Sequence, residues 1–286
     1  MTKIAINGFG RIGRSTFRRI IENHPDLEVI AINDLADTKT LAHLLKYDSI
    51  YGPYNKKVDF KERSITVDGK EVKILGERDP SSLPWKDLGV DIVLECTGLF
   101  ASTDKASQHL KAGAKKVIIS APCKDKTAHF VLGVNQDKYK GEEVISMASC
   151  TTNCLAPVAK VLNDNFEIES GLMTTMHSYT NDQRLQDSPH EDLRRARAAA
   201  LSMIPTTTGA AIAVTKALPE LEGRIDGMAI RVPTASVSLI DFVVKVKKET
   251  DVKGVNSAFK KASQEMKGIL GVEDELLVSM DYKGNP

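Results

Sequence analysis

The sequence predicts an α/β protein in two parts: a doubly wound parallel sheet, then an α+β domain with a mostly antiparallel sheet. In the first half, runs apolar on both faces alternate with helical patterns, which is typical of a parallel sheet covered on both sides. In the second half, a long strand is apolar on one face only, which is typical of an antiparallel sheet. The 286 residues are too many for one ordinary core. The pattern changes near residue 149, which predicts domains over 1–149 and 150–286.

The first-half strands are short and apolar. They are expected at 3–7, 28–33, 91–96, 116–120, 129–134 and 143–148, with one helix after the first strand and another over 102–114. Residues 58–75 alternate polar and apolar around Asp68-Gly69, a dipeptide favoured in tight hairpin turns. We therefore expect a hairpin inserted among the strands and helices of this half.

The second half contains one long amphipathic strand over 236–247. Ile240, Phe242 and Val244 share one of its faces, whereas Asp241 and Lys245 share the other. Helices are expected at 151–163, 208–218 and 252–267. A strand with one apolar face and one polar face predicts a sheet covered by helices on a single side.

Charge, hydropathy and cysteine content disfavour several classes of protein function. Lys plus Arg number 39 and Asp plus Glu 38, so no long-range field favours nucleic acid or an anionic membrane. No apolar run approaches the roughly 18 residues of a membrane span, and the N-terminus runs into a strand pattern without a signal-type segment. Four cysteines are too few for a disulfide scaffold, and no Cys-x-x-Cys or histidine pair completes a metal site. We expect a cytoplasmic protein that binds neither metal, membrane nor nucleic acid.

A glycine-rich motif follows the first strand. The run Gly8-Phe9-Gly10-Arg11-Ile12-Gly13 precedes a helix, and Asp34 ends the next strand about 20 residues later. Such glycines allow a tight turn and a close approach of backbone to pyrophosphate, while an acidic residue accepts hydrogen bonds from the ribose. A structural turn and a surface acid are the alternatives, but Asp37 is the better helix cap, which leaves Asp34 free. This context predicts an NAD site.

A second motif lies where the pattern changes. Cys150 stands between a strand ending near Ala148 and an amphipathic helix. Open α/β sheets bind ligands at the carboxyl ends of strands, and a helix N-terminus stabilises a thiolate. Cys154 falls on the apolar stripe of the helix and is interpreted as a small buried residue. Cys150 is the predicted nucleophile.

A thiol nucleophile needs a base, and the chain has six histidines. His177 ends the strand-like run 172–176 and is the favoured candidate, although the residues alone leave other histidines open. His109 and His190 fall in polar surroundings and are expected at the surface.

A third group has the chemistry of anion binding. It consists of hydroxyls, a glycine amide and guanidinium groups at loop or element ends: Ser149, Thr151, Thr180, Thr208, Gly209, Arg195 and Arg231. Each member alone is more commonly a helix cap or a surface residue, so the group is only suggestive of phosphate recognition.

Five runs of residues carry a family resemblance. The segments 6–14 (INGFGRIGR), 148–154 (ASCTTNC), 177–183 (HSYTNDQ), 192–199 (DLRRARAA) and 231–234 (RVPT) resemble phosphorylating glyceraldehyde-3-phosphate dehydrogenases of the bacterial type. The resemblance extends along the whole chain. It implies a Rossmann-type NAD-binding domain, a homotetramer and a role in glycolysis.

The resemblance also implies a chemistry. Cys150 attacks the aldehyde of glyceraldehyde 3-phosphate, His177 takes the hydroxyl proton as hydride passes to NAD, and inorganic phosphate cleaves the thioester to give 1,3-bisphosphoglycerate. Ser149, Thr151, Thr208 and Gly209 match the inorganic-phosphate side, and Thr180, Arg195 and Arg231 match positions that contact substrate or phosphate. The NAD contacts match at Arg11, Ile12, Asp34, Arg78, Thr97 and Ser120.

Two departures from the family pattern leave alternatives open. Ser188 stands where NAD-preferring relatives often carry a larger apolar residue, which weakens one barrier to NADP. The chain ends at Pro286, before the family's final strand and helix, so we expect a C-terminally shortened chain. Erythrose-4-phosphate dehydrogenase and an inactive truncated subunit that only binds nucleotide are the alternative functions. A cysteine hydrolase is disfavoured by the glycine motif.

Overall fold

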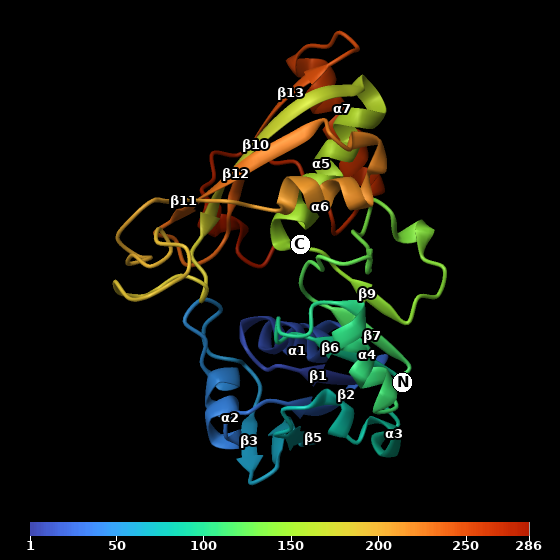
Figure 1. Ribbon diagram of the computed structural model, residues 1–286, viewed down its shortest axis with the longest axis vertical. Coiled ribbons are helices and arrows are strands. Elements are labelled where there is room, and N and C mark those ends of the chain that lie inside the picture. The colour runs from blue at the N-terminus through green and yellow to red at the C-terminus, as the bar shows by residue number, and fades with distance from the viewer. Residues whose placement is uncertain (286) are drawn as a thin grey trace. The chain divides into compact units, whose positions relative to one another are not determined.

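The computed structural model of the chain describes residues 1–285. It consists of two compact units (Figure 1). Unit 1 comprises Met1–Phe130 and Tyr139–Ala148, and unit 2 comprises Val131–Lys138 and Ser149–Pro286. Within residues 1–285, no helix is both long enough and apolar enough to cross a membrane.

Unit 1 contains a mixed sheet of nine strands in the order β3-β4-β5-β2-β1-β6-β7-β9-β8. The strands are β1 Thr2–Asn7, β2 Leu27–Asn33, β3 Val58–Lys61, β4 Ser64–Val67, β5 Lys70–Leu75, β6 Ile92–Glu95, β7 Lys116–Ile119, β8 Ala128–His129 and β9 Val144–Ser146. The helices are α1 Arg11–Asn23, α2 Thr38–Lys46, α3 Trp85–Leu88 and α4 Thr103–Lys111. Every pairing from β5 to β8 is parallel, which confirms the predicted doubly wound sheet.

The core of unit 1 lies on both faces of this sheet. Consecutive residues of β1 face opposite sides. Ile6 belongs to a cluster with Phe17 of α1, whereas Ala5 belongs to a cluster with Trp85 of α3. Both residues of β1 are completely buried, so the sheet is covered on each side. This double burial is why its strands are continuous apolar runs.

The predicted hairpin forms, and it extends the edge of the sheet. Asp68 and Gly69 both have positive φ values, 48° and 84°, between the antiparallel strands β4 and β5. Two positive φ values in succession are what a two-residue turn of the primed type requires.

The strand expected over 129–134 is mostly absent. Only His129 of this range belongs to a strand, the two-residue β8, and the chain then turns, with Val131 N donating to Asn135 Oδ1 at 2.8 Å. Phe130, Val131 and Val134 of this run are buried and Leu132 is exposed, and Asn135 offers the backbone a local partner in place of a neighbouring strand. An apolar run was therefore an insufficient criterion for a strand here.

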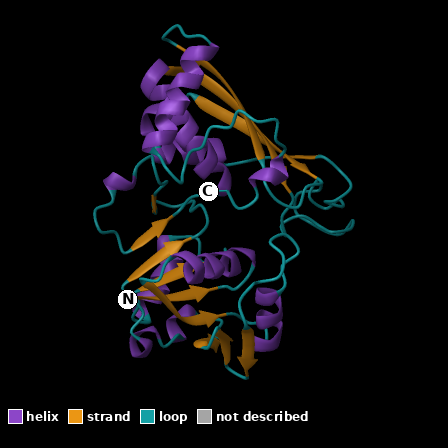
Figure 2. Cartoon of the chain, turned by 180° about the vertical axis from the view of Figure 1, so that it is seen from behind, coloured by secondary structure: helices purple, strands orange, loops and turns teal. Residues whose placement is uncertain are grey.

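Unit 2 contains a four-stranded sheet in the order β11-β12-β10-β13. Its elements are α5 Cys150–Phe166, β10 Ile168–Ser178, β11 Ile204–Thr206, α6 Ala210–Ala217, β12 Ile225–Val232, β13 Leu239–Val246 and α7 Val252–Glu265. Only the pairing of β10 with β12 is parallel, so the sheet is mostly antiparallel as predicted. Figure 2 shows the helices of unit 2 gathered on one side of this sheet. In β13, Phe242 and Val244 are half-buried whereas Asp241 and Lys245 are exposed, which confirms the predicted two faces.

Candidate active site

Cys150 is the first residue of α5, and the residue before it caps the helix. Ser149 Oγ accepts a hydrogen bond from Thr152 N at 3.0 Å. Ala148 has a φ of 58°, a left-handed conformation that alanine rarely adopts. A helix start has unpaired N–H groups and a positive dipole end, both of which stabilise an anion. The sharp turn and the cap therefore place the thiol where a thiolate is favoured.

His177 lies beside this thiol, near the end of β10. Its Nε2 is 3.3 Å from Cys150 Sγ, and its side chain is buried. The hydrogen bond with His177 lowers the pKa of the Cys150 thiol, and the charge of His177 lowers it further, against an opposing effect of burial. The pair is an activated thiol with a proton acceptor in contact.

Arg231 holds the other side of the His177 ring. The two residues are register partners on the parallel strands β12 and β10. Arg231 Nη1 lies 2.8 Å from His177 Nδ1, and it donates to Ser178 O at 3.0 Å. His177 Nδ1 itself lies 2.6 Å from Ser178 O. The Ser178 carbonyl only accepts, so Nδ1 donates to it, which leaves Nε2 without a proton and directed toward the sulfur.

The residues of the predicted anion-binding group all lie in unit 2, at two helix starts, in the loop after β10 and, for Arg231, on β12. Thr151 Oγ1 is 4.0 Å from Cys150 Sγ. Gly209 caps α6, which packs beside α5, and Thr208 Oγ1 accepts from Ala210 N at 3.1 Å. Thr180 N donates to Gln183 Oε1 at 3.4 Å. The structure therefore places the Thr151 hydroxyl beside the Cys150 thiol, and it places Thr208 and Gly209 at the start of a second helix, α6.

Two arginines contribute positive charge to the same unit. Arg195 forms an ion pair with Asp182. Burial lowers the pKa of Arg231, and the charge of Arg195 lowers it further. Guanidinium groups match phosphate and carboxylate oxygens in charge and geometry, so both arginines are candidates for anion binding.

In unit 1, the three motif glycines have three different surroundings. A Cβ added to Gly13 would lie 2.2 Å from Gly8 O, and one added to Gly8 would lie 2.8 Å from Thr97 N. Gly8 also has a φ of 90°. In contrast, a Cβ at Gly10 would meet no atom within 4 Å, and no side chain caps α1. Gly8 and Gly13 serve the turn and the packing, whereas Gly10 leaves room for a pyrophosphate above the helix start.

Asp34 lies at the end of β2, beside the glycine motif. Its carboxylate accepts from Phe9 N at 2.7 Å and from Ala36 N at 3.0 Å. Asp37, not Asp34, caps α2, as the sequence suggested. Ile12 is 53% exposed on the first turn of α1, and Arg11 forms an ion pair with Asp48.

A cavity of about 370 Å³ lies at this carboxyl edge of the sheet. Its lining includes five of the predicted cofactor residues, namely Gly8, Gly10, Asp34, Arg78 and Thr97. Ser120 follows β7, and its Oγ donates to Glu95 O at 3.0 Å. An open cavity at the carboxyl ends of parallel strands is where nucleotides bind in doubly wound sheets.

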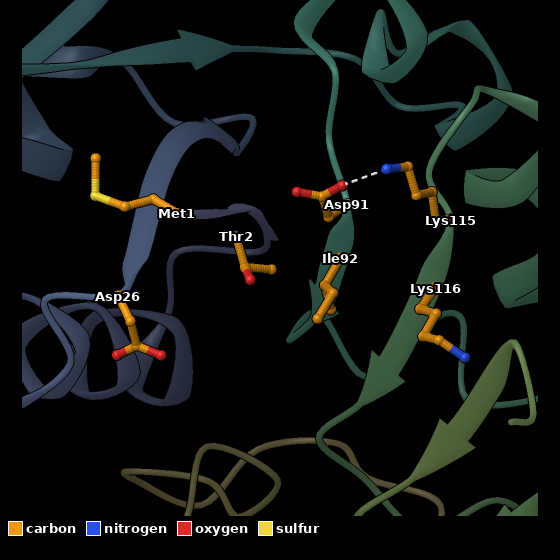
Figure 3. A pocket seen from close by; sticks show the side chains of 7 residues that line it. All are labelled: Met1, Thr2, Asp26, Asp91, Ile92, Lys115 and Lys116. Carbon is orange, nitrogen blue, oxygen red and sulfur yellow. Dashed lines mark ion pairs between the residues drawn. The ribbon is translucent and has the colours of Figure 1, made fainter. Parts of the chain in front are cut away.

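A second cavity of about 670 Å³ lies at the opposite edge of unit 1 (Figure 3). Its lining residues lie at the amino ends of the strands: Thr2 is the first residue of β1, Asp91 precedes β6, and Lys115 precedes β7. The two charges seen closest together, Asp91 and Lys115, form an ion pair of 2.7 Å. The amino edge of such a sheet is not the ligand-binding edge, so we assign no function to this cavity.

Comparison with known proteins decides the family. Residues 2–103 match the NAD binding domain of glyceraldehyde 3-phosphate dehydrogenase, and residues 149–286 match its C-terminal domain. The chain is 58% identical to glyceraldehyde-3-phosphate dehydrogenase 1 of Bacillus cereus, a match that covers 99% of this chain and 86% of the relative. It is also 58% identical to the glyceraldehyde-3-phosphate dehydrogenase of Geobacillus stearothermophilus, over 99% of this chain and 85% of the relative. The chain belongs to the glyceraldehyde 3-phosphate dehydrogenase family.

NAD is the cofactor of this family member, since the match to the family's NAD binding domain includes the glycine motif and Asp34. The dehydrogenase has no group of three or more His, Cys, Asp or Glu side chains within residues 1–285 that could hold a metal ion.

Two sequence interpretations of side-chain burial in this dehydrogenase were wrong. Cys154 is exposed, because the buried stripe of α5 runs through Leu155, Ala159 and Leu162 and Cys154 lies beside it. His109 is completely buried, because it faces the sheet together with Ala106 of α4. The buried partner of His109, Glu95, was missed by the sequence reasoning. Its signal was an acidic residue ending an apolar strand.

Proposed function

We propose that this chain oxidises glyceraldehyde 3-phosphate with NAD and inorganic phosphate, yielding 1,3-bisphosphoglycerate. The contact of 3.3 Å between Cys150 Sγ and His177 Nε2 carries the proposal. A thiol with a lowered pKa, at a helix start and beside an imidazole, is the arrangement that covalent catalysis on an aldehyde requires.

Cys150 and His177 act in turn. The Cys150 thiol gives its proton to His177 Nε2, the thiolate forms a C–S bond with the aldehyde carbon, and the carbonyl oxygen takes that proton from Nε2. His177 Nε2 then removes the hydroxyl proton while the hydride leaves the same carbon, which converts the adduct to a thioester. A phosphate oxygen attacks the thioester carbon, the C–S bond breaks, and the Cys150 thiolate is restored.

The cofactor-binding residues of the proposal are Gly8, Gly10, Arg11, Ile12, Gly13, Asp34, Arg78, Thr97 and Ser120, within an NAD-binding domain over 1–149. NAD supplies a hydride acceptor when bound. The space above Gly10, the uncapped start of α1 and the cavity beside Asp34 fit its adenosine half.

The substrate-binding residues of the proposal belong to a catalytic domain over 150–286 and the cap residue before it. Ser149, Thr151, Thr208 and Gly209 serve inorganic phosphate, and Thr180, Arg195 and Arg231 serve substrate or phosphate. Hydroxyls, two helix starts and two guanidinium groups in one unit support this assignment.

The proposed assembly is a homotetramer in the cytoplasm, acting in glycolysis. The loop between β10 and β11 carries apolar side chains that are 80% exposed or more, at Leu185, Leu193 and Leu201. Apolar side chains exposed to this extent in one loop favour a subunit interface. Light scattering after gel filtration tests this assembly, with a mass four times the 31.3 kDa of the chain as the expected result.

The test of the activity is NADH formation from aldehyde and NAD, with and without inorganic phosphate. We expect sustained turnover only with phosphate, and none from Cys150→Ser. Erythrose 4-phosphate is the competing substrate. A higher kcat/KM for erythrose 4-phosphate than for glyceraldehyde 3-phosphate would reassign the substrate, and loss of all turnover would support a nucleotide-binding subunit.

A further inference from the structure

A row of hydrogen bonds crosses the carboxyl edge of the sheet in unit 1. Asn33, Asn7 and Glu95 are the last residues of the neighbouring strands β2, β1 and β6. Asn33 Nδ2 donates to Asn7 Oδ1 at 2.7 Å, and Asn7 Nδ2 donates to Glu95 Oε2 at 2.6 Å. At the far end, Asn33 Oδ1 accepts from the backbone N of Glu77 at 2.8 Å, just after β5. The row therefore links the ends of four adjacent strands.

Glu95 is the acceptor on which the row converges. Its side chain is fully buried. Oε1 accepts from Thr97 N at 2.8 Å and from the Thr97 hydroxyl, whose oxygen in turn accepts from Leu99 N at 3.0 Å. Oε2 accepts from Asn7 and lies 3.1 Å from His109 Nε2. The carboxylate is thus surrounded by four hydrogen-bonding groups and is shielded from water.

The tautomer of His109 follows from its second contact. Trp85 Nε1 lies 3.0 Å from His109 Nδ1. An indole N–H only donates, so Nδ1 carries no proton and the ring is neutral with its proton on Nε2. His109 Nε2 therefore donates to Glu95. Four hydrogen-bonding groups therefore converge on the two carboxyl oxygens of Glu95.

Glu95 lies behind the cofactor cavity. The cavity of about 370 Å³ is lined by Asn7, Asn33, Glu77 and Thr97, whereas Glu95 and His109 are absent from its lining. Thr97 is also pressed against the glycine motif, since a Cβ on Gly8 would lie 2.8 Å from Thr97 N. Glu95 thus holds two wall residues, Thr97 and Asn7, and through Thr97 the position of the glycine turn.

We propose that Glu95 is a positioning residue for NAD: its buried carboxylate holds Thr97 and Asn7 in the geometry that binds the adenosine half. Trp85 supports Glu95 by keeping His109 in the tautomer that donates to it. A carboxylate is required because a neutral amide cannot accept all four hydrogen bonds. This inference rests on the proposed assignment of NAD to the cavity.

The test measures binding of ADP-ribose, which lacks the nicotinamide, by calorimetry. Glu95→Gln turns an NH2 group toward two donors, so we expect its Kd for ADP-ribose and its KM for NAD to rise about tenfold or more. The KM for glyceraldehyde 3-phosphate and the alkylation rate of Cys150 in the cofactor-free protein should change less than about twofold. Glu71→Gln is the matched control, because Glu71 is a half-exposed carboxylate of the same sheet outside the cavity.

A second pair of variants separates positioning from loss of fold. His109→Gln keeps an N–H donor for Glu95 and an oxygen acceptor for the Trp85 indole, whereas His109→Phe keeps only the bulk. We expect ADP-ribose binding close to that of the unmodified protein for His109→Gln and weaker binding for His109→Phe. Far-ultraviolet circular dichroism reports the folded state of each variant, because the emission of Trp85 would respond to loss of its contact with His109.

Three outcomes would overturn the proposal: unchanged ADP-ribose affinity in Glu95→Gln, equal losses in Glu95→Gln and Glu71→Gln, or equal losses in the two His109 variants. Gly10→Ala distinguishes this failure from failure of the cofactor assignment. If Gly10→Ala weakens binding while Glu95→Gln does not, only the inference about Glu95 fails. If Gly10→Ala binds ADP-ribose normally, the assignment of NAD to the cavity fails, and the inference about Glu95 fails with it.

Discussion

The sulfur of Cys150 lies 3.3 Å from Nε2 of His177, and the hydrogen bond between them lowers the pKa of the thiol. A lowered pKa means that the thiolate persists to lower pH than in a free cysteine. Burial alone would raise the pKa of Cys150, so the contact with His177 is the largest cause of the net lowering of that pKa.

Alkylation of the cofactor-free protein with iodoacetamide tests this contact. In His177→Asn, the rate profile of Cys150 should move to higher pH, with a loss at neutral pH of about tenfold for each unit of the shift. Cys96 is the internal reference, because burial raises its pKa to about 11. Peptide mapping that finds Cys123 or Cys154 modified before Cys150 would refute the assignment of the nucleophile.

The Ser149 cap of α5 should contribute both to the stability of the protein and to the reactivity of Cys150. Ser149→Ala removes the acceptor of the Thr152 N–H and should cost about 1 kcal/mol in the free energy of unfolding. It should also slow alkylation of Cys150, since the first turn of α5 is no longer held. Asp251→Ala is the matched control, because Asp251 caps α7 by accepting from Gly254 N. Asp251→Ala should lower stability by a similar amount and leave Cys150 unaffected. Equal alkylation rates in the two variants would exclude a role of the cap in activation.

Two glycine substitutions should separate packing from ligand binding. Gly13→Ala forces a methyl group to within 2.2 Å of Gly8 O, so we expect a loss of about 1–3 kcal/mol in the free energy of unfolding. Gly10→Ala meets no atom of the protein within 4 Å, so stability should change little while NAD affinity falls. Thermal unfolding and calorimetric titration measure the two effects. Weaker NAD binding without loss of stability in Gly13→Ala would contradict the assignment of Gly13 to packing and of Gly10 to ligand binding.

Asp34 should set the preference for NAD over NADP. Its carboxylate lies beside the glycine motif and would repel a 2′-phosphate. Asp34→Asn keeps an oxygen that can accept from Phe9 N but removes the charge, so the ratio of kcat/KM values for NAD and NADP should fall about tenfold or more. Steady-state kinetics with both cofactors measure this ratio. Equal efficiency of the unmodified chain with NAD and NADP would show that Asp34 does not select the cofactor.

Much of the fold followed from local patterns, because those patterns report burial directly. The parallel sheet was predictable since its strands, such as β1, are buried on both faces and therefore apolar throughout. The turn at Asp68-Gly69 and the cap at Asp37 depend on the chemistry of one or two residues. Such features are encoded within a few positions of the chain.

The buried polar row was not predictable in the same way. His109 lies on a helix with polar neighbours, and only contacts with Glu95 and Trp85, 14 and 24 residues earlier, show why it is buried. Similarly, Arg231 and His177 meet because β12 and β10 pair in parallel, a register that composition does not specify. Long-range partners such as these require the folded topology.

The most direct test of the account is a single-turnover measurement without inorganic phosphate. Mixing the protein with NAD and glyceraldehyde 3-phosphate should give a burst of NADH stoichiometric with the subunits, and the reaction should then stop. Mass analysis should find the acyl group on Cys150 alone, and adding phosphate should release it and restart turnover. Sustained NADH formation without phosphate, or an acyl group on another residue, would contradict the proposed mechanism.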